Sequence, residues 1–210
     1  MISKQAQVKG ILAKLLETGI KILIKKECKQ IGEIKIDIIA SSVQIIKGKI
    51  QKIHIKAEEI NYKDLLFDKI ELEANNLNII FKLNSKELKF KNKFIIHFNI
   101  SLSEKSLKTI LLSNSWNWIG NMITKGILNK DQLEDIKIKN DQLLIKGSKD
   151  KQTISEGEKI GLRAEKGKIY LSAKTNNNSI KIPIEDKVYI KTIDIRNNLI
   201  IISASSSLSI

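Results

Sequence analysis

The chain has few of the residues on which disulfide scaffolds and base-specific nucleic-acid readers depend. Its 210 residues include one cysteine, Cys28, and two arginines, Arg163 and Arg196, and aromatic residues make up 5%. A single cysteine excludes a disulfide within the chain and is compatible with a reducing compartment. Because base reading favours Arg, Asn and Gln and base stacking needs exposed aromatic rings, nucleic-acid binding is the less favoured alternative.

Long uninterrupted apolar runs are also lacking. No stretch reaches the ~18–20 apolar residues that a membrane-spanning helix needs. The apolar stretch near the N-terminus is interrupted by Lys14, Glu17 and Lys21, and it has no small-residue cleavage site for a secretory signal. We therefore expect a cytoplasmic protein without a signal peptide or a transmembrane segment, which can lie peripherally on a membrane surface.

Recognisable catalytic motifs are missing as well. The sequence contains no P-loop and no G-x-G-x-x-G, G-x-S-x-G or H-E-x-x-H motif. His54 and His97 fall on the polar faces of predicted strands, and together with the distant Cys28 they do not make a metal site. We expect no catalytic residue, no metal and no cofactor, and we predict that the protein is not an enzyme.

Lysine, in contrast, is abundant, and the formal net charge is +14. Such an excess of positive charge usually indicates a phosphate-bearing partner, either nucleic acid or an anionic membrane surface. The chain is also rich in Ile and Asn, a bias that an AT-rich coding sequence produces without selection for charge. Both explanations of the charge stay open at this point.

The stretch 48–83 alternates apolar and polar residues in the way that is typical of half-buried antiparallel strands. Its alternating apolar positions are Ile53, Ile55 and Ala57, then Ile70, Leu72 and Ala74, then Leu77, Ile79, Phe81 and Leu83. A hairpin with its loop near 61–63 must pair apolar positions with each other, so the numbers of paired residues must sum to an odd value. Two registers satisfy this rule: Ile55 opposite Ile70, or Lys56 opposite Glu71.

The same alternation predicts further strands on both sides of this hairpin. The predicted strands are 34–38, 43–57, 66–74, 77–83 after a kink at 75–76, 94–102, and several short strands between 133 and 204. Tight turns are predicted at 165–168 and 196–199, and Pro183 argues for an edge position of the strand that contains it.

Two amphipathic helices are predicted from apolar residues at helical spacing. The first covers 3–28, although Ile20, Ile22 and Ile24 also fit strand spacing and leave an earlier end open. Its apolar stripe packs on the sheet in the favoured interpretation and lies on an anionic bilayer in the alternative one. Ser103 is the expected N-cap of the second helix, which should extend to about Leu128.

These elements predict an α+β fold in which long curved antiparallel β-meander sheets pack on two amphipathic helices, in the order α-β-α-β. We expect one elongated domain over 1–210, with two possible halves, 1–102 and 103–210. A helix of ~22 residues is ~33 Å long, and a strand of ~10 residues spans a similar length at ~3.3 Å per residue. Such strands can curl around such a helix, an arrangement that resembles tubular lipid-binding folds.

The hairpin also carries a resemblance to a known family. Its pattern is G-K-I-x-x-I-x-I-x-A-x-x-I-x-Y-x-x-L-x-F-D-x-I-E-L-x-A-x-N-L, in which the matching residues are Gly48, Ile50, Ile53, Ile55, Ala57, Tyr62, Leu65, Phe67, Ile70, Leu72, Ala74 and Leu77. This pattern resembles the LmeA-like phospholipid-binding family, a bacterial family long described only as a domain of unknown function. An amphipathic helix before the hairpin and a Leu-rich helix after it are similar too. The resemblance implies a lipid-binding or lipid-handling role and no established enzyme activity.

We therefore predict a peripheral phospholipid-binding protein that holds acyl chains in an apolar groove between sheet and helices and anionic headgroups at lysines. The predicted groove residues are Phe67, Phe81, Phe94, Phe98, Leu111, Trp116, Trp118 and Met122. The predicted headgroup residues are Lys21, Lys25, Lys26 and Lys29. The alternatives are a basic nucleic-acid-binding protein and a non-catalytic structural or assembly partner that uses a sheet edge.

Overall fold

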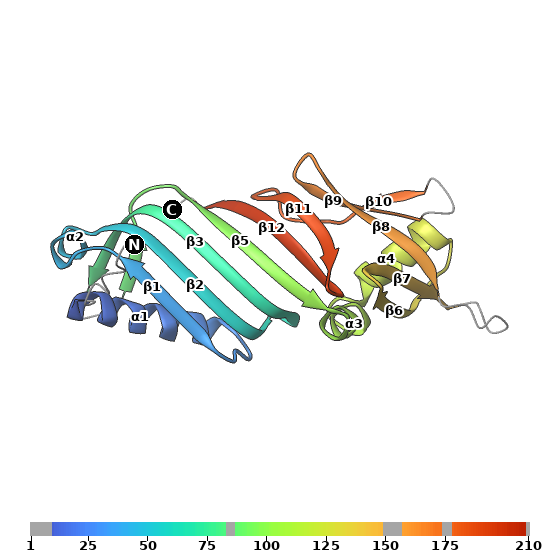
Figure 1. The fold of residues 1–210 in the computed structure, drawn as a ribbon, viewed down its shortest axis with the longest axis horizontal. Helices are drawn as coiled ribbons and strands as arrows, with labels where there is room; N and C mark the ends of the chain where they lie inside the picture. Colours follow the sequence, from blue (N-terminus) through green and yellow to red (C-terminus); the bar gives the residue numbers. More distant parts are fainter. Residues whose placement is uncertain (1–9, 83–86, 149–156, 174–177, 209–210) are drawn as a thin grey trace, which may run out of the picture.

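The structure, a computed structural model, describes residues 10–82, 87–148, 157–173 and 178–208, without the side chains of 81, 82, 87 and 88. It is elongated, with a larger curved sheet at one end and a smaller sheet at the other (Figure 1). The predicted mixed α+β class with mostly antiparallel sheets is confirmed. The division into a single domain or two halves stays a prediction.

The larger sheet combines strands from both halves of the chain. Within the described residues, its order is β1-β2-β3-β5-β12-β11, and β4 pairs with the C-terminal end of β3. Its strands are β1 (Ile34–Ile39), β2 (Lys49–Tyr62), β3 (Leu65–Lys82), β4 (Glu87–Phe90), β5 (Phe94–Ser103), β11 (Val188–Arg196) and β12 (Leu199–Leu208). Because β12 pairs with β5, the C-terminal hairpin completes a sheet that the N-terminal half begins.

The smaller sheet has the order β10-β9-β8-β7-β6. Its strands are β6 (Leu133–Lys139), β7 (Gln142–Gly147), β8 (Glu158–Glu165), β9 (Lys168–Ala173) and β10 (Ser179–Lys181). It meets the larger sheet at β11, where the Ile190 N–H donates to the Gly167 carbonyl oxygen over 3.0 Å. The second half of the chain therefore contributes to both sheets.

The predicted odd register of the β2–β3 hairpin is confirmed. Ile55 lies opposite Leu72 and Lys56 opposite Glu71, which is the second of the two registers. Apolar side chains therefore share one face, and charged side chains of opposite sign share the other, where Lys56 Nζ lies 3.6 Å from Glu71 Oε1.

Two kinks bend this hairpin. Glu59 (φ 53°) and Asn76 (φ 54°) have left-handed backbone conformations inside long strands. On β3 the buried position changes from Ala74 before the kink to Leu77 after it, so the kink moves the apolar residues from even to odd positions. The predicted kink at 75–76 is confirmed, and the one at Glu59 was not predicted. Irregularities of this kind bend and twist a sheet, which matches the curvature in Figure 1.

Two-residue turns connect four of the hairpins. Their central residues all have positive φ, as type I′ turns require, and the central pairs are Lys63–Asp64, Asn140–Asp141, Lys166–Gly167 and Asn197–Asn198. The turns predicted at 165–168 and 196–199 are therefore confirmed.

The predicted strand start at Val43 is wrong, because residues 42–46 form a short helix, α2 (Ser42–Ile46). The Ser41 hydroxyl accepts from the Gln44 N–H over 3.2 Å, and Gln44 Oε1 accepts from the Ser41 N–H over 2.7 Å. This reciprocal capping box satisfies two backbone donors and starts a helix where the apolar pattern alone indicates a strand.

The first helix, α1 (Ile11–Glu27), continues through Ile20, Ile22 and Ile24, which also fit strand spacing. The alternative in which the helix ends before these residues is therefore wrong. Ala13, Leu16 and Ile20 are buried on one side of it, and this tertiary packing favours the helical period. Ser103 caps the next helix as predicted, with its hydroxyl accepting from the Ser106 N–H.

The predicted second helix is two helices, α3 (Glu104–Leu112) and α4 (Asn117–Leu128). The break lies at Ser113, whose hydroxyl donates to the Ile110 carbonyl and accepts from the Trp116 N–H. Local side-chain bonds of this kind compete with the helical ladder. The apolar periodicity did not indicate this break, because the segment between the two helices, 113–116, contains neither proline nor glycine.

The apolar side chains form two core clusters. One lies between α1 and the β1–β3 end of the larger sheet, and the other lies among α3, α4, the smaller sheet and the β5, β12 and β11 strands. Phe67 contacts both clusters. Among the helices of the described residues, none combines the length and the apolarity that crossing a bilayer requires.

Candidate functional site

One apolar face runs across six strands of the larger sheet. Hydrogen-bonded pairing aligns its side chains in rows that cross six strands. One row is Ile36, Ile55, Leu72, Phe98, Ala204 and Ile190, and the next is Ile34, Ala57, Ile70, Ile100, Ile202 and Ile193. Such an apolar face must be covered by another layer if it is not to face water.

The cover is incomplete in the middle of this face. At its two edges the rows are buried, by α1 over β1 and by the smaller sheet next to β11. Along the centre, Leu72, Ile96 and Phe98 are only half-buried. Leu72 belongs to neither core cluster among the residues that the structure describes. The centre of the sheet is therefore a seam between two cores.

A half-open apolar groove of about 170 Å³ lies at this seam, and we call it the seam groove. Its lining residues are Ile20, Ile53, Ile55, Leu72, Glu73, Ala74, Leu77, Phe90, Phe94, Ile96 and Leu208. The rings of Phe90 and Phe94 form one wall, with centroids 4.5 Å apart. The groove thus has a helix on one side and strands of the larger sheet on the other.

Glu73 is the one charged residue among the described residues of this lining, and its carboxylate lies on the other face of the sheet. There it lies 2.7 Å from Lys52 Nζ, and Asn75 donates to it over 3.1 Å. The hydrogen bond from Lys52, followed by the one from Asn75, lowers the pKa of Glu73 from its ordinary value. The ionised carboxylate is satisfied outside the groove, so the groove itself offers an apolar surface.

Of the four predicted aromatic strand residues, Phe94 is in the described lining of this groove. Phe98 is half-buried next to Leu72 in the same row, and Phe67 lies between the two cores. Phe81 lies on β3, but its side chain is outside the described residues. The assignment of these residues to an acyl-chain groove stays a prediction.

The four predicted residues of the second helix lie elsewhere. Leu111 is buried in the other core, and Met122 is half-buried on α4. Trp116 is half-buried and its Nε1–H donates to the Lys63 carbonyl over 3.0 Å, whereas Trp118 is 49% exposed. None of the four lines the seam groove. Trp116 packs against the core cluster that contains Leu111.

The predicted headgroup lysines lie along and just after the second half of α1. Lys25 and Lys26 are exposed, and Lys21 is half-buried one residue from Ile20 of the seam groove. Lys29 Nζ lies 2.6 Å from Asp64 Oδ1, and Ser115 donates to the other carboxylate oxygen. The hydrogen bond from Lys29 is the largest cause of the lowered pKa of Asp64. Lys29 therefore already has an anionic partner that ties α1 to the β2–β3 turn.

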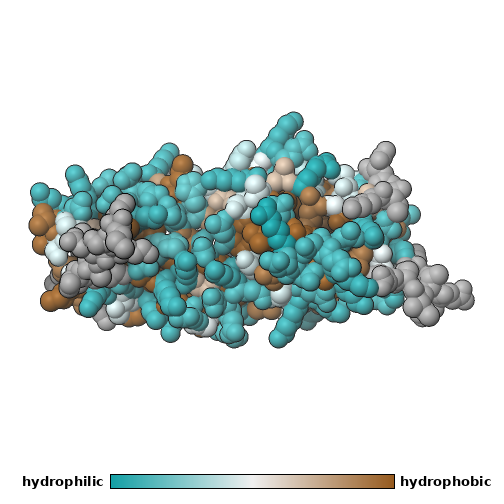
Figure 2. Space-filling model, viewed as in Figure 1, coloured by the Kyte–Doolittle hydropathy of each residue, from teal (hydrophilic) through white to brown (hydrophobic). Residues whose placement is uncertain are grey.

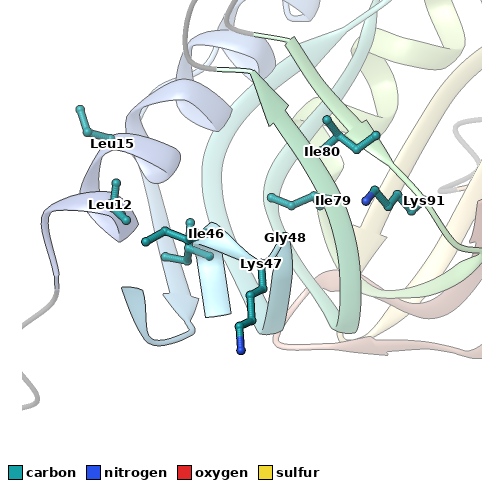
Figure 3. Close-up of a pocket in the computed structure, with 9 residues that line it drawn as sticks. Leu12, Leu15, Ile46, Lys47, Gly48, Ile79, Ile80 and Lys91 are labelled. Carbon is teal, nitrogen blue, oxygen red and sulfur yellow. The ribbon is translucent and has the colours of Figure 1, made fainter. Parts of the chain in front are cut away.

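A second hollow, about 330 Å³, lies at the end of the molecule remote from the smaller sheet, and we call it the end pocket. Its lining residues are Leu12, Leu15, Ile45, Ile46, Lys47, Gly48, Ile79, Ile80 and Lys91. Figure 3 shows Leu12 and Leu15 of α1 on one side of the pocket and Ile79 and Ile80 of β3 on the other, with Ile46 and Lys47 between the two elements. Sequence reasoning missed this pocket because α2 was predicted as strand.

The described residues contain no group of three or more His, Cys, Asp and Glu side chains that could hold a metal ion. Comparisons with protein-family models, with curated proteins and with solved structures find no match. The resemblance to the LmeA-like family therefore stays a prediction.

Proposed function

We propose that this protein binds anionic phospholipid without catalysing a reaction on it, with part of one acyl chain in the seam groove. The observation that carries the proposal is the apolar face that crosses six strands and is left half-covered at Leu72, Ile96 and Phe98. The curved sheet with a helix along its apolar face also supports a tubular lipid-binding fold.

The chemistry of the groove selects an apolar chain over a polar ligand. Among the residues that the structure describes, its lining offers no charged or amide side chain that points inward, so a polar ligand would lose hydrogen bonds to water without replacement. Its volume of about 170 Å³ is below the ~300–1,000 Å³ of ordinary small-molecule sites. It therefore fits a segment of an acyl chain, and the rest of the lipid lies along the half-covered face.

The lysines of α1 supply the attraction for the headgroup. Lys21 follows Ile20, which lines the groove, and Lys25 is one turn further along the helix. Near an anionic surface each lysine contributes roughly 1 kcal/mol. Because Lys29 is paired with Asp64, we assign this role to Lys21, Lys25 and Lys26 alone.

The test uses two neighbouring residues on opposite faces of β5. Ile96 lines the seam groove, whereas Ile95 is 53% exposed on the other face. We expect Ile96→Trp to fill the groove and abolish binding of a phospholipid with a fluorescent acyl chain, and Ile95→Trp to bind it as the wild type does. Thermal unfolding of both variants checks that each still folds.

The proposal fails if Ile96→Trp folds and binds the fluorescent lipid with unchanged affinity. It also fails if the wild-type protein binds no lipid but binds single-stranded or double-stranded nucleic acid at moderate salt. That second result would assign the lysine excess to phosphate attraction through nucleic acid.

A further inference from the structure

Helix α1 has a second apolar stripe that the fold does not use. Ile11, Leu15 and Ile22 lie within about 40° of one another around the helix axis at 3.6 residues per turn. They lie roughly opposite the buried stripe of Ala13 and Leu16. Ile11 is 78% and Ile22 is 55% exposed. A helix that only covers a sheet needs one apolar stripe, so the outer one needs a separate explanation.

The exposed apolar surface continues onto α2. Ile46 is 75% exposed, Val43 is exposed beside it, and Ile46 and Leu15 line the same end pocket. Figure 2 shows apolar side chains at the end of the molecule that carries α1 and α2. We define Ile11, Leu15, Ile22, Val43 and Ile46 as the outer face. Clustered exposed apolar residues of this kind mark interaction sites.

Positive charge borders this face. On the helical wheel, Lys14, Lys21 and Lys25 flank one side of the α1 stripe and Lys26 flanks the other. Lys47 and Lys91 line the end pocket. An apolar stripe flanked by lysines is the pattern of a helix that lies in the interface of an anionic bilayer.

From this arrangement we infer that the outer face is a docking surface for an anionic lipid bilayer, with α1 lying parallel to the membrane plane. The apolar side chains enter the interface while the flanking lysines contact lipid phosphates. The inner stripe of α1 stays on the sheet. The helix therefore connects the membrane surface directly with the seam groove, which Ile20 lines from its inner side.

The inference rests on the proposed function for the chemistry of the partner, and the two share the lysines of α1, but the outer face and the seam groove are different surfaces. Their failures can be separated. Ile96→Trp should lose uptake of the fluorescent lipid and keep docking on vesicles. A variant of the outer face should lose docking and keep uptake of a short-chain lipid presented below its micellar concentration.

Docking is measured by co-sedimentation with vesicles of phosphatidylcholine alone or with 30% phosphatidylserine added, at about 150 mM salt. The variant Leu15→Ser/Ile22→Ser changes two exposed residues of the outer face, and Leu112→Ser is the control because Leu112 is an exposed leucine on α3. We expect the double variant to lose at least tenfold in affinity for anionic vesicles, and the control to be unchanged.

Charge is tested separately with Lys14→Gln/Lys25→Gln. Since a lysine near an anionic surface strengthens binding about fivefold, we expect a loss of about 25-fold. Lys105→Gln/Lys187→Gln is the control, because it removes the same charge from exposed positions on other elements. Equal losses in the two charge variants would mean attraction by net charge alone and would overturn the inference.

Insertion is observed with an environment-sensitive fluorophore at Ile46→Cys, in a Cys28→Ser background, with Leu112→Cys as the control site. We expect a blue shift at position 46 and none at position 112 when anionic vesicles are added. Equal shifts at both sites, or no shift at either, would overturn the inference. A shift that depends on protein concentration without vesicles would also overturn it, since a second copy of the chain would then cover the face.

Discussion

The substitution Gly48→Ala tests how α2 is joined to β2 and therefore how the end of the molecule is built. Gly48 has φ 70°, and its carbonyl accepts from the Ile79 N–H over 2.7 Å. A Cβ at this position would lie 2.2 Å from the Ile79 carbonyl oxygen. The alanine therefore meets both a disfavoured backbone conformation and a clash with main-chain atoms.

The conformational part alone is worth about 1–2 kcal/mol for a residue with a Cβ. The clash adds to it, because a strand backbone cannot move aside as the end of a flexible side chain can. We expect Gly48→Ala to lower the free energy of unfolding by at least about 2 kcal/mol. Urea denaturation followed by far-ultraviolet circular dichroism measures this change.

Gly19→Ala is the matched control. Gly19 lies in the interior of α1, and a Cβ there would meet nothing within 4 Å. Since alanine is favoured over glycine inside a helix, we expect this variant to be more stable by up to about 1 kcal/mol. A Gly48→Ala protein as stable as the wild type would refute the close approach of Gly48 to β3.

Three further predictions concern single contacts. Asp64→Asn removes the ion pair with Lys29, whose effect is to lower the pKa of Asp64 in the folded protein. The ion pair stabilises the folded wild type at pH values above the ordinary carboxyl pKa, and this stabilisation is lost as pH falls below about 4. The free energy of unfolding of the variant, measured by urea denaturation, should therefore decrease less steeply between about pH 4 and 2 than that of the wild type. Ile127→Ala removes a fully buried side chain and should cost about 2–5 kcal/mol in the same assay, and a change below 1 kcal/mol would contradict its core position. Ser41→Ala removes the side-chain cap of α2 and should cost about 1 kcal/mol, with Ser41→Asp retaining most of the stability.

Local patterns predicted much of the larger sheet. The alternation at Ile53 and Ile55 against Leu72 and Ala74 required an odd register because burial of one face fixes strand pairing. The turn at 197–198 was readable for a similar reason, since asparagine tolerates the positive φ that a tight hairpin needs. The hairpin register and the turn are both determined by residues that are close together in the sequence.

The pairing of β12 with β5 could not be predicted from the sequence. Ala204 lies opposite Phe98, more than one hundred residues away, and nothing in either strand specifies the other. That pairing places the C-terminal hairpin on the larger sheet and thereby creates the seam at Leu72. The sequence-based prediction placed the helical lining of the groove on the second helix, whereas the seam groove is lined by Ile20 of α1 and by Leu208, which the apolar alternation did not indicate.

The role assigned to the second helix shows another limit of periodicity. Leu111 and Trp116 fit helical stripes, yet the break at Ser113 changes the direction of the chain, and α3 and α4 cover the other core. The outer face of α1 was predicted only in part, since the sequence left open whether the apolar stripe of this helix packs on the sheet or lies on a bilayer. The structure shows two stripes, one buried and one exposed.

The most direct test of the central claim is photo-crosslinking with a phospholipid that carries a diazirine in the middle of one acyl chain. After irradiation, mass spectrometry of peptides locates the attachment sites. We expect sites on the central apolar face, at Leu72, Phe94 and Ile96, and their loss in Ile96→Trp. Attachment only to residues outside this face, or attachment unchanged in Ile96→Trp, would contradict the claim that the seam groove holds the acyl chain.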